Sequence, residues 1–210
     1  MSTPSASPRP QVREALLAAA RDELTEHGQA GISLRAVARR AGVSHAAPKH
    51  HFGDRGGLLT AVAVEGFDAL SVALTAAADE LDSTDAPAAR LAALGRAYVD
   101  FGLRHPALFD LMFRPAELHS DDPALVAARR DALGVLSAAV TQVASSELEP
   151  SGTPDLALLS WALAHGLVAL ARDGALHRAA GRATEDPALP LGLIGLFSAA
   201  MARATTGETP

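Results

Sequence analysis

Residues 33–52 read SLRAVARRAGVSHAAPKHHF, and the spacing of small and apolar residues in this segment predicts two short helices joined by a tight turn. Ser33 stands where an N-cap is expected, and Val37 and Ala38 fall on the apolar side of the first helix. Gly42 suits the left-handed backbone that ends a helix. This arrangement is typical of a helix-turn-helix, whose second helix can enter the major groove of DNA.

The second helix carries side chains that a merely solvated surface does not explain. We expect Ser44 to cap it, and residues 44–51 contain three histidines, one lysine and no acidic residue. Lys49 is the single lysine of the chain. Two helices of an ordinary bundle would explain the Ala38 and Gly42 spacing in a chain rich in both residues. They would not explain this set of side chains, which favours binding to a polyanion.

Charge is unevenly distributed along the chain. Residues 1–60 hold eight basic and five acidic side chains, whereas residues 61–210 hold ten basic and nineteen acidic ones. Half of the eight histidines also lie in the first segment. A net charge of -6 for the whole chain therefore does not exclude a nucleic-acid partner. The asymmetry indicates a polyanion-binding module joined to an acidic body.

Composition predicts an all-α chain. Of the 210 residues, 49% are hydrophobic and only 4% are aromatic, with alanine and leucine dominant and no period-two strand pattern. Apolar spacing and helix breakers predict about nine helices, the last five at residues 88–104, 107–113, 124–148, 155–173 and 191–204. We expect a disordered tail at 1–9, a DNA-binding domain at 10–60 and a larger helical domain at 61–210.

Several classes of function and location are disfavoured by what the sequence lacks. The chain has no cysteine, so a disulfide framework and a thiolate metal site are excluded. No phosphate-binding loop, dinucleotide fingerprint or hydrolase motif occurs, and Asp121 and Asp122 fit solvated loop carboxylates. We expect no enzyme activity, cofactor or metal. No secretory signal is present, and the apolar runs at 163–171 and 191–202 are too short or interrupted to span a membrane, which predicts a cytoplasmic protein.

The segment from Val12 to Phe67 resembles the DNA-binding domain of the TetR family of transcriptional regulators. The pieces that carry the resemblance occur together at the family's intervals: Gly28, Ser33, Gly42-Val43-Ser44, His51-Phe52, Arg55 and Leu58-Leu59. Lys49 departs from the tyrosine that is usual two residues before the His-Phe pair, and Arg55 replaces the usual lysine. Pro48 lies within the second helix, where it forfeits a backbone hydrogen bond. These departures bear on which operator sequence is bound.

The resemblance implies roles in DNA binding for a set of residues in this segment. We expect phosphates to be held by Ser33, His51 and Arg55, together with the amides of Gly56 and Gly57. We expect Arg35 to be solvated or to face phosphate. Residues expected to face the groove, behind the cap Ser44, are His45, Ala46, Ala47, Lys49 and His50. Alanine can contact a thymine methyl group, and lysine or histidine can donate to guanine.

The C-terminal half resembles one type of TetR C-terminal domain, through Trp161…His165-Gly166 and the segment 105–113, HPALFDLMF. The resemblance implies an effector pocket lined by Phe101, Phe109, Met112, Phe113, Trp161 and His165. The alternative for each is a place in an ordinary packed core. It also implies a homodimer, in which helices 155–173 and 191–204 pack against their copies as a four-helix bundle.

The sequence thus predicts a homodimeric, ligand-responsive regulator, a repressor that binds a palindromic operator and is released by a small-molecule effector. A regulator that has lost its response to an inducer is a first alternative. A second is a helical ligand carrier or enzyme whose N-terminal helices are vestigial. The basic balance of residues 1–60 and the position of Lys49 speak against the second alternative.

Overall fold

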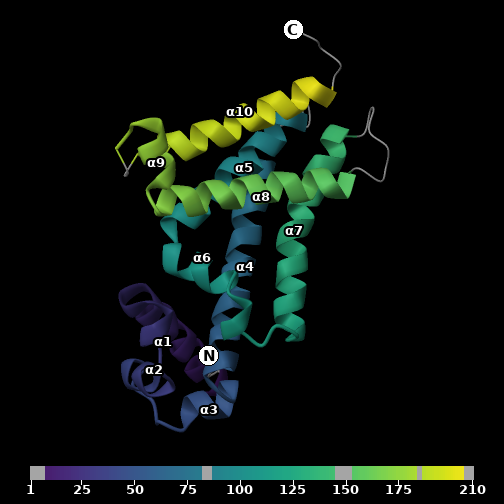
Figure 1. Cartoon of the computed structure of the whole chain (residues 1–210). Coiled ribbons are helices and arrows are strands. Elements are labelled where there is room, and N and C mark those ends of the chain that lie inside the picture. The colour runs from purple at the N-terminus through teal and green to yellow at the C-terminus, as the bar shows by residue number, and fades with distance from the viewer. Residues whose placement is uncertain (1–7, 82–86, 145–152, 184–185, 206–210) are drawn as a thin grey trace, which may run out of the picture. The chain divides into compact units, whose positions relative to one another are not determined.

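The computed structural model describes residues 8–81, 87–144, 153–183 and 186–205, and these residues form only helices and their connections (Figure 1). The all-α prediction is confirmed. Most of the expected N-terminal tail lies outside the described residues. The helices are α1 (Pro8–Gly31), α2 (Leu34–Arg40), α3 (Ala47–Phe52), α4 (Arg55–Asp79), α5 (Pro87–Arg104), α6 (Pro106–Met112), the 3-10 helix η1 (Pro115–Glu117), α7 (Pro123–Ala144), α8 (Thr153–Arg172), α9 (Ala175–Ala180) and α10 (Ala188–Thr205).

The chain folds into two compact units. The first contains the chain up to Phe67 together with Ala107–Arg129, and the second contains Asp68–Pro106 and the chain from Arg130 onward. Helices α4 and α7 therefore contribute to both units. Helix α6 and η1 belong with the helix-turn-helix although they follow it by many residues. The sequence predicts domains at residues 10–60 and 61–210, which places residues 107–129 in the second domain and not with the helix-turn-helix. That division stays a prediction.

The core of the first unit is built from the apolar stripes of α1, α2 and α4. Leu16 and Leu24 on α1, Val37 on α2 and Leu58 on α4 are almost completely buried. Gly28 has a φ of +65°, so the regular part of α1 ends there, as its position in the sequence predicts, and a kinked last turn leads to α2.

The second unit is organised around α5, which packs against both α8 and α10, while α8 also contacts α9 and α10. The side chain of Ile194 on α10 packs directly on the backbone of α5, because a Cβ atom on Gly95 would lie 2.6 Å from Cγ1 of Ile194. Helix α9 was not predicted from sequence. It has only six residues, between Gly174 and Gly181, and both glycines adopt positive φ angles. Gly174 does end α8, as predicted.

Two helices among the described residues are long and apolar enough to cross a membrane by length and composition, α4 and the segment Asp155–Arg172 of α8. Of the two apolar runs considered in the sequence, residues 163–171 lie inside the second of these helices, and most of residues 191–202 belong to the shorter apolar helix Ala188–Met201. Single residues such as Gly166 and His165 interrupt the apolar run of α8, but the mean hydropathy over the whole helix stays high. Core helices of soluble proteins pass the same test, and half of the α4 window is buried inside the protein, against 28% for α8.

Candidate nucleic-acid interface

Helix α2 begins as the sequence predicts and is fixed to α1 by an ion-pair cluster. The Oγ of Ser33 accepts a hydrogen bond from the amide of Ala36 at 3.1 Å, which confirms the N-cap. Arg40 at the other end of α2 donates from Nε to the buried Glu23 at 2.7 Å and from Nη1 to Glu26 at 2.8 Å. The hydrogen bonds from Arg40 hold the pKa of Glu26 below its usual value. Arg40 therefore serves the packing of α2 on α1.

The turn after α2 also has the predicted conformation. Gly42 has a φ of +66°, and its amide donates to the carbonyl of Arg39 at 3.2 Å. The amide of Val43 donates to the carbonyl of Ala38 at 3.1 Å. These two bonds form a Schellman motif, which satisfies the last carbonyls of the helix. Glycine is needed at position 42 for its left-handed backbone and not for lack of space, since a Cβ there would meet nothing within 4 Å.

Helix α3 begins later than predicted, and the predicted cap at Ser44 is wrong. The cap position is Ala46, and no side chain caps the helix. A helix capped by Ser44 would need the amide of Pro48 to donate to the Ser44 carbonyl, and proline has no amide hydrogen. The Ser44 carbonyl instead accepts a hydrogen bond from the amide of Ala47 at 3.0 Å, three residues ahead, which forms a turn and not a helix. The first bond with helical spacing runs from the amide of His50 to the carbonyl of Ala46 at 3.1 Å. The recognition element is therefore the turn 44–46 followed by α3.

The side chains expected to face the DNA groove divide by exposure. Ala47 is half-buried and the other four are exposed. Outside that set, His51, which is expected to hold a phosphate, is half-buried, and Pro48 is buried against the unit. The burial of Pro48 fixes which side of the short helix faces outward. We call the exposed set, with no acidic member, the recognition face: His45, Ala46, Lys49 and His50.

Sequence reasoning missed Arg13 on α1. Its guanidinium lies 5.5 Å from the centre of the Phe52 ring, at the end of α3. The Phe52 ring lies 6.2 Å from the ring of His51, so Arg13 brings a cation to the end of the recognition element. No local spacing links Arg13 to Phe52, since the contact depends on how α1 packs against α3.

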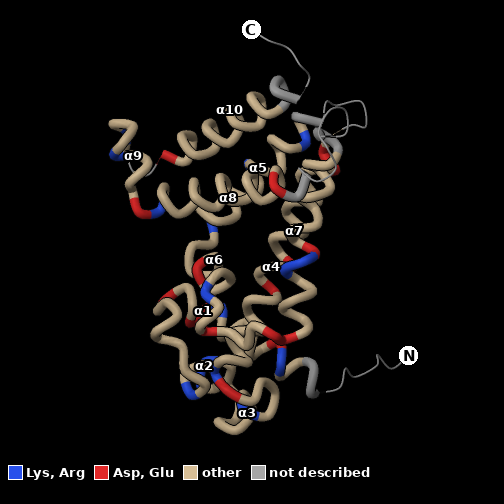
Figure 2. The backbone as a smooth tube through the Cα atoms, turned by 45° about the vertical axis from the view of Figure 1, so that its right-hand side comes forward, with Lys and Arg blue, Asp and Glu red and all other residues tan. Residues whose placement is uncertain are grey.

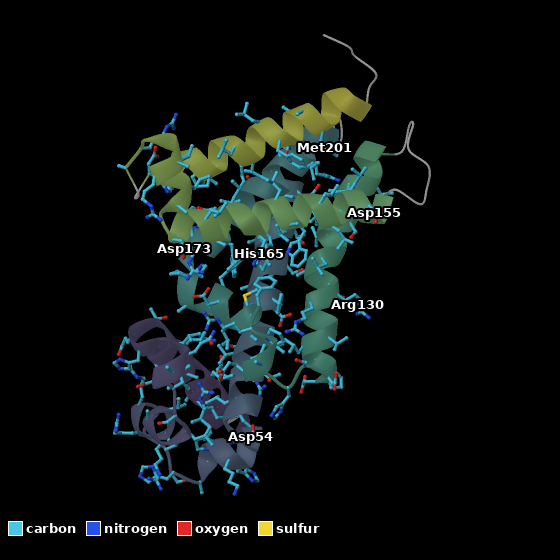
Figure 3. All side chains as sticks on the ribbon, in the orientation of Figure 1. Asp54, Arg130, Asp155, His165, Asp173 and Met201 are labelled. Atoms are coloured by element: carbon cyan, nitrogen blue, oxygen red, sulfur yellow. The ribbon has the colours of Figure 1, made fainter. Side chains whose placement is uncertain are left out.

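The start of α4 is capped by a side chain that the sequence analysis did not assign. Asp54 is labelled in Figure 3. Its Oδ1 accepts a hydrogen bond from the Gly57 amide at 2.8 Å and lies 3.2 Å from Nε2 of His119. The Gly57 amide, expected to hold phosphate, is thus already bonded within the protein. A Cβ on Gly57 would lie 2.0 Å from the Phe52 carbonyl oxygen, so glycine is needed there for packing.

Arg55, expected to hold a phosphate, makes three hydrogen bonds inside its own unit. Its Nε donates to the Ile32 carbonyl at 3.1 Å, and its Nη2 donates to the Gln29 carbonyl at 2.7 Å. Its Nη1 donates to Glu117 of η1 at 2.6 Å. The side chain is 37% exposed, but its charge faces a carboxylate. Among the other expected phosphate contacts, Ser33 and Arg35 are exposed.

In the second unit, three aromatic side chains share one hydrogen-bonded network. Trp161 Nε1 donates to the Tyr98 hydroxyl at 3.0 Å, and that hydroxyl lies 3.0 Å from Nδ1 of His165. The Tyr98 hydroxyl thus joins the indole of Trp161 to the imidazole of His165. Burial raises the pKa of Tyr98 and lowers that of His165. Tyr98 carried no motif in the sequence, so only the packing of α5 on α8 identifies it.

The six residues expected to line an effector pocket are divided between the two units. Phe101, Trp161 and His165 belong to the second unit. The other three pack together in the first unit: the Phe109 and Phe113 rings are 4.9 Å apart, and a Cβ on Gly66 would lie 2.8 Å from Met112 Sδ. These contacts are those of a packed core, and ligand binding by these residues stays a prediction.

Helices α8 and α10 expose large apolar side chains in the second unit. Leu158, Leu159 and Leu170 on α8 are 57%, 61% and 48% exposed, and Leu196 on α10 is 67% exposed. We call these four residues the leucine face. Figure 2 shows that α8 and α10 carry few charged residues along their length. Across the described part of the chain, no group of three histidine or acidic side chains has the arrangement of a metal site.

Comparison with known sequences finds two matching families. Residues 16–62 match the family described as bacterial regulatory proteins, tetR family, and residues 91–188 match the one described as tetracyclin repressor-like, C-terminal domain. An HTH-type transcriptional regulator of Mycobacterium tuberculosis (strain ATCC 25618 / H37Rv) is 30% identical over 105 residues, or 50% of this chain and 44% of the relative. The chain thus spans less than half the length of the curated relatives it matches.

Solved structures share the architecture over nearly the whole chain. A protein of unknown function from Rhodococcus sp. RHA1 is 34% identical with a TM-score of 0.77, covering 97% of this chain and 98% of that one. The TetR-like transcriptional regulator LfrR from Mycobacterium smegmatis, solved in complex with proflavine, is 24% identical with a TM-score of 0.57, covering 97% and 99%. The second likeness shows the fold alone.

Proposed function

This chain belongs to the TetR family of helix-turn-helix transcriptional regulators, and from that premise we propose that it binds operator DNA through the turn and helix at residues 44–51. It acts in the cytoplasm as a homodimer on a palindromic operator. It is a repressor, released by a small-molecule effector that binds the helical body. Its C-terminal domain is of the type that carries the Trp161…His165-Gly166 signature. The family acts by binding rather than by catalysis, so no enzymatic role is assigned.

The observation that carries this proposal is the recognition face. Lys49 and two histidines are exposed on one short element, without an acidic neighbour on that element. Lysine and histidine donors reach base edges and phosphates in the major groove, and Ala46 offers a methyl group to thymine. Ser33 and Arg35 lie exposed at the start of α2, where a phosphate contact would fix the register.

A dimer supplies the second recognition element that a palindrome requires, and the leucine face supports such a dimer. Large exposed apolar side chains that recur along one stripe of a helix indicate an interaction surface. Leu159 and Leu170 lie on one stripe of α8 with Gly166, where an added Cβ would meet nothing within 4 Å. A copy of α8 therefore has room to approach the backbone there.

An effector can release the operator only if it binds one state of the dimer better than the other. The network of Tyr98, Trp161 and His165 is the part of the body best suited to sense a ligand. It presents aromatic rings and hydrogen-bonding polar atoms inside an otherwise apolar bundle. A ligand that takes one of these hydrogen bonds would change how α5 packs on α8.

The proposal is tested by titrating the purified chain against a labelled DNA fragment from upstream of its own gene, at several salt concentrations. Saturable binding should survive an excess of unrelated duplex, and the logarithm of affinity should fall linearly with the logarithm of salt concentration. Absence of binding to any duplex, even at low salt, would contradict a DNA-binding function. The helical body would then have to be searched for a ligand or an activity of its own.

A further inference from the structure

Arg55 joins the start of α4 to the segment that leads into α2. Its Nε and Nη2 donate to the carbonyls of Ile32 and Gln29 at 3.1 and 2.7 Å; Gln29 lies in the kinked last turn of α1, and Ile32 follows that turn. The last carbonyls of a helix lack partners within that helix, and an arginine suits them because its planar group donates in several directions. Ser33 follows Ile32 directly. Arg55 thus fixes the backbone from which Ser33 caps α2.

Glu117 holds the guanidinium of Arg55 from the opposite side. Its Oε2 lies 2.6 Å from Nη1, and both side chains are a little over one-third exposed, at 37% and 38%. Glu117 ends η1, in the segment that connects α6 to α7. The carboxylate therefore orients Arg55 toward the two carbonyls while balancing its charge.

Two further contacts attach the same segment to α4, and we call residues 115–119 the clasp. His119 Nε2 lies 3.2 Å from Asp54, the residue that caps α4. The backbone amide of His119 donates to Oγ1 of Thr60 at 2.8 Å. Leu118 between them is buried. The clasp thus meets α4 at its cap, its first residue and its second turn.

We propose that Arg55 and Glu117 are a positioning pair for DNA binding: the clasp, through Glu117, holds Arg55 on the backbone before α2 and so sets the place of Ser33. This rests on the proposed DNA-binding function. It replaces the phosphate contact that the sequence resemblance implies for Arg55. Arg55 acts on DNA through the position of α2, and residues 115–119, distant in sequence from the helix-turn-helix, become part of the DNA-binding machinery.

The salt dependence of binding to the upstream DNA fragment separates positioning from phosphate contact. Each phosphate contact contributes about 0.9 to the slope of log affinity against log salt. Arg55→Ala should lower affinity about tenfold at fixed salt, as expected for lost hydrogen bonds to a charged group, and leave the slope unchanged. Glu117→Gln should lower affinity in the same direction. Arg130→Ala is the matched control and should change neither quantity, because Arg130 is an exposed arginine on α7 that donates hydrogen bonds to its neighbour Asp131.

The conservative variant gives a second, independent readout. Arg55→Lys keeps the charge, which would preserve a phosphate contact, but one ammonium group cannot reach two carbonyls and a carboxylate in the geometry of the guanidinium. Arg55→Lys should therefore bind DNA as weakly as Arg55→Ala. Restored affinity in Arg55→Lys, a slope reduced by about 0.9 in Arg55→Ala, or tighter binding by Glu117→Gln would overturn the positioning role.

A thermal unfolding cycle without DNA distinguishes failure of this proposal from failure of the proposed function. The stability losses of Arg55→Ala and Glu117→Gln should be non-additive in the double variant, because each removes the same contact. Additive losses would show that the two side chains do not act together, and would contradict the pair. If the wild-type chain binds no duplex while the cycle is non-additive, then the DNA-binding function has failed, and with it the positioning role.

Discussion

The recognition face and the leucine face both expose side chains that the fold of a single chain does not explain, but they do so with opposite chemistry. The recognition face presents Lys49 and two histidines from a six-residue helix and the turn before it. The leucine face presents four leucines from two of the longest helices in the second unit. One suits a solvated polyanion, and the other suits an apolar surface.

The difference between the two faces means that salt separates them. Contacts between lysine or arginine and phosphate release counterions, so DNA binding weakens steeply as salt rises. Burial of leucine is not screened by salt and is strengthened by salts that are excluded from the protein surface. A regulator that needs both faces should therefore lose DNA before it loses its dimer as salt is added.

The largest effect is expected from Leu159→Glu on the leucine face. A carboxylate buried unpaired in a helix interface costs several kcal/mol, which raises the dimer dissociation constant by about 100-fold or more. Sedimentation equilibrium measures this directly. Val72→Glu on α4, at a valine that is 69% exposed, is the matched control and should leave the dimer intact. Equal mass distributions for Leu159→Glu and wild type would remove the leucine face as an interface.

Lys49→Ala on the recognition face comes next. A base contact is worth about 1–3 kcal/mol, so affinity for the upstream fragment should fall by roughly tenfold or more, whereas dimerisation should be unchanged. If Lys49 contacts phosphate instead, affinity falls for all duplexes alike and the salt slope drops by about 0.9 per contact. An unchanged affinity at low salt would mean that the recognition face does not touch DNA.

The same comparison explains what the sequence could predict. The Ser33 cap and the Gly42 turn follow from residues within a few positions of one another, because a cap and a Schellman motif are local hydrogen-bond patterns. The cap predicted at Ser44 failed for an equally local reason, the missing amide hydrogen of Pro48. Local sequence patterns are therefore enough to locate the recognition face. They are also enough to correct the predicted start of α3, because Pro48 excludes a helix that begins at Ser44.

Contacts between distant segments could not be predicted in this way. Arg55 was assigned to phosphate because the family motif places a basic residue there, and its contact with Glu117 depends on how the 115–119 segment folds back on α4. Tyr98 meets Trp161 and His165 only because α5 packs against α8. The spacing of residues does not determine which apolar stripes pack against one another. The helices of the second unit could therefore be predicted from the sequence, whereas the contacts among its side chains could not.

Gly42→Ala tests how far the recognition face depends on its turn. An alanine in the left-handed conformation should destabilise the protein by about 1–2 kcal/mol, measured by urea unfolding, and weaken DNA binding through the position of α3. The control is Gly134→Ala in α7, where an added Cβ also meets nothing within 4 Å and no positive φ is present. That change should stabilise by about 0.5–1 kcal/mol. The same sign in both variants would contradict the role of the left-handed turn.

The smallest effect concerns pH and belongs to the body rather than to the recognition face. Burial holds the pKa of His165 below its usual value, so the unfolded chain binds a proton more readily than the native chain does. Stability is therefore fully present above the unfolded value of about 6.5 and is lost as pH falls from there toward the native value. His165→Asn keeps a polar group near the position of Nδ1 that can bond to Tyr98, and it cannot titrate. Its melting temperature should fall less than that of the wild type between about pH 7 and pH 5, by about 2 °C or less. Parallel curves for the two proteins would mean that His165 is as easily protonated in the native chain as in the unfolded one, and the Tyr98 network would then not hold it neutral.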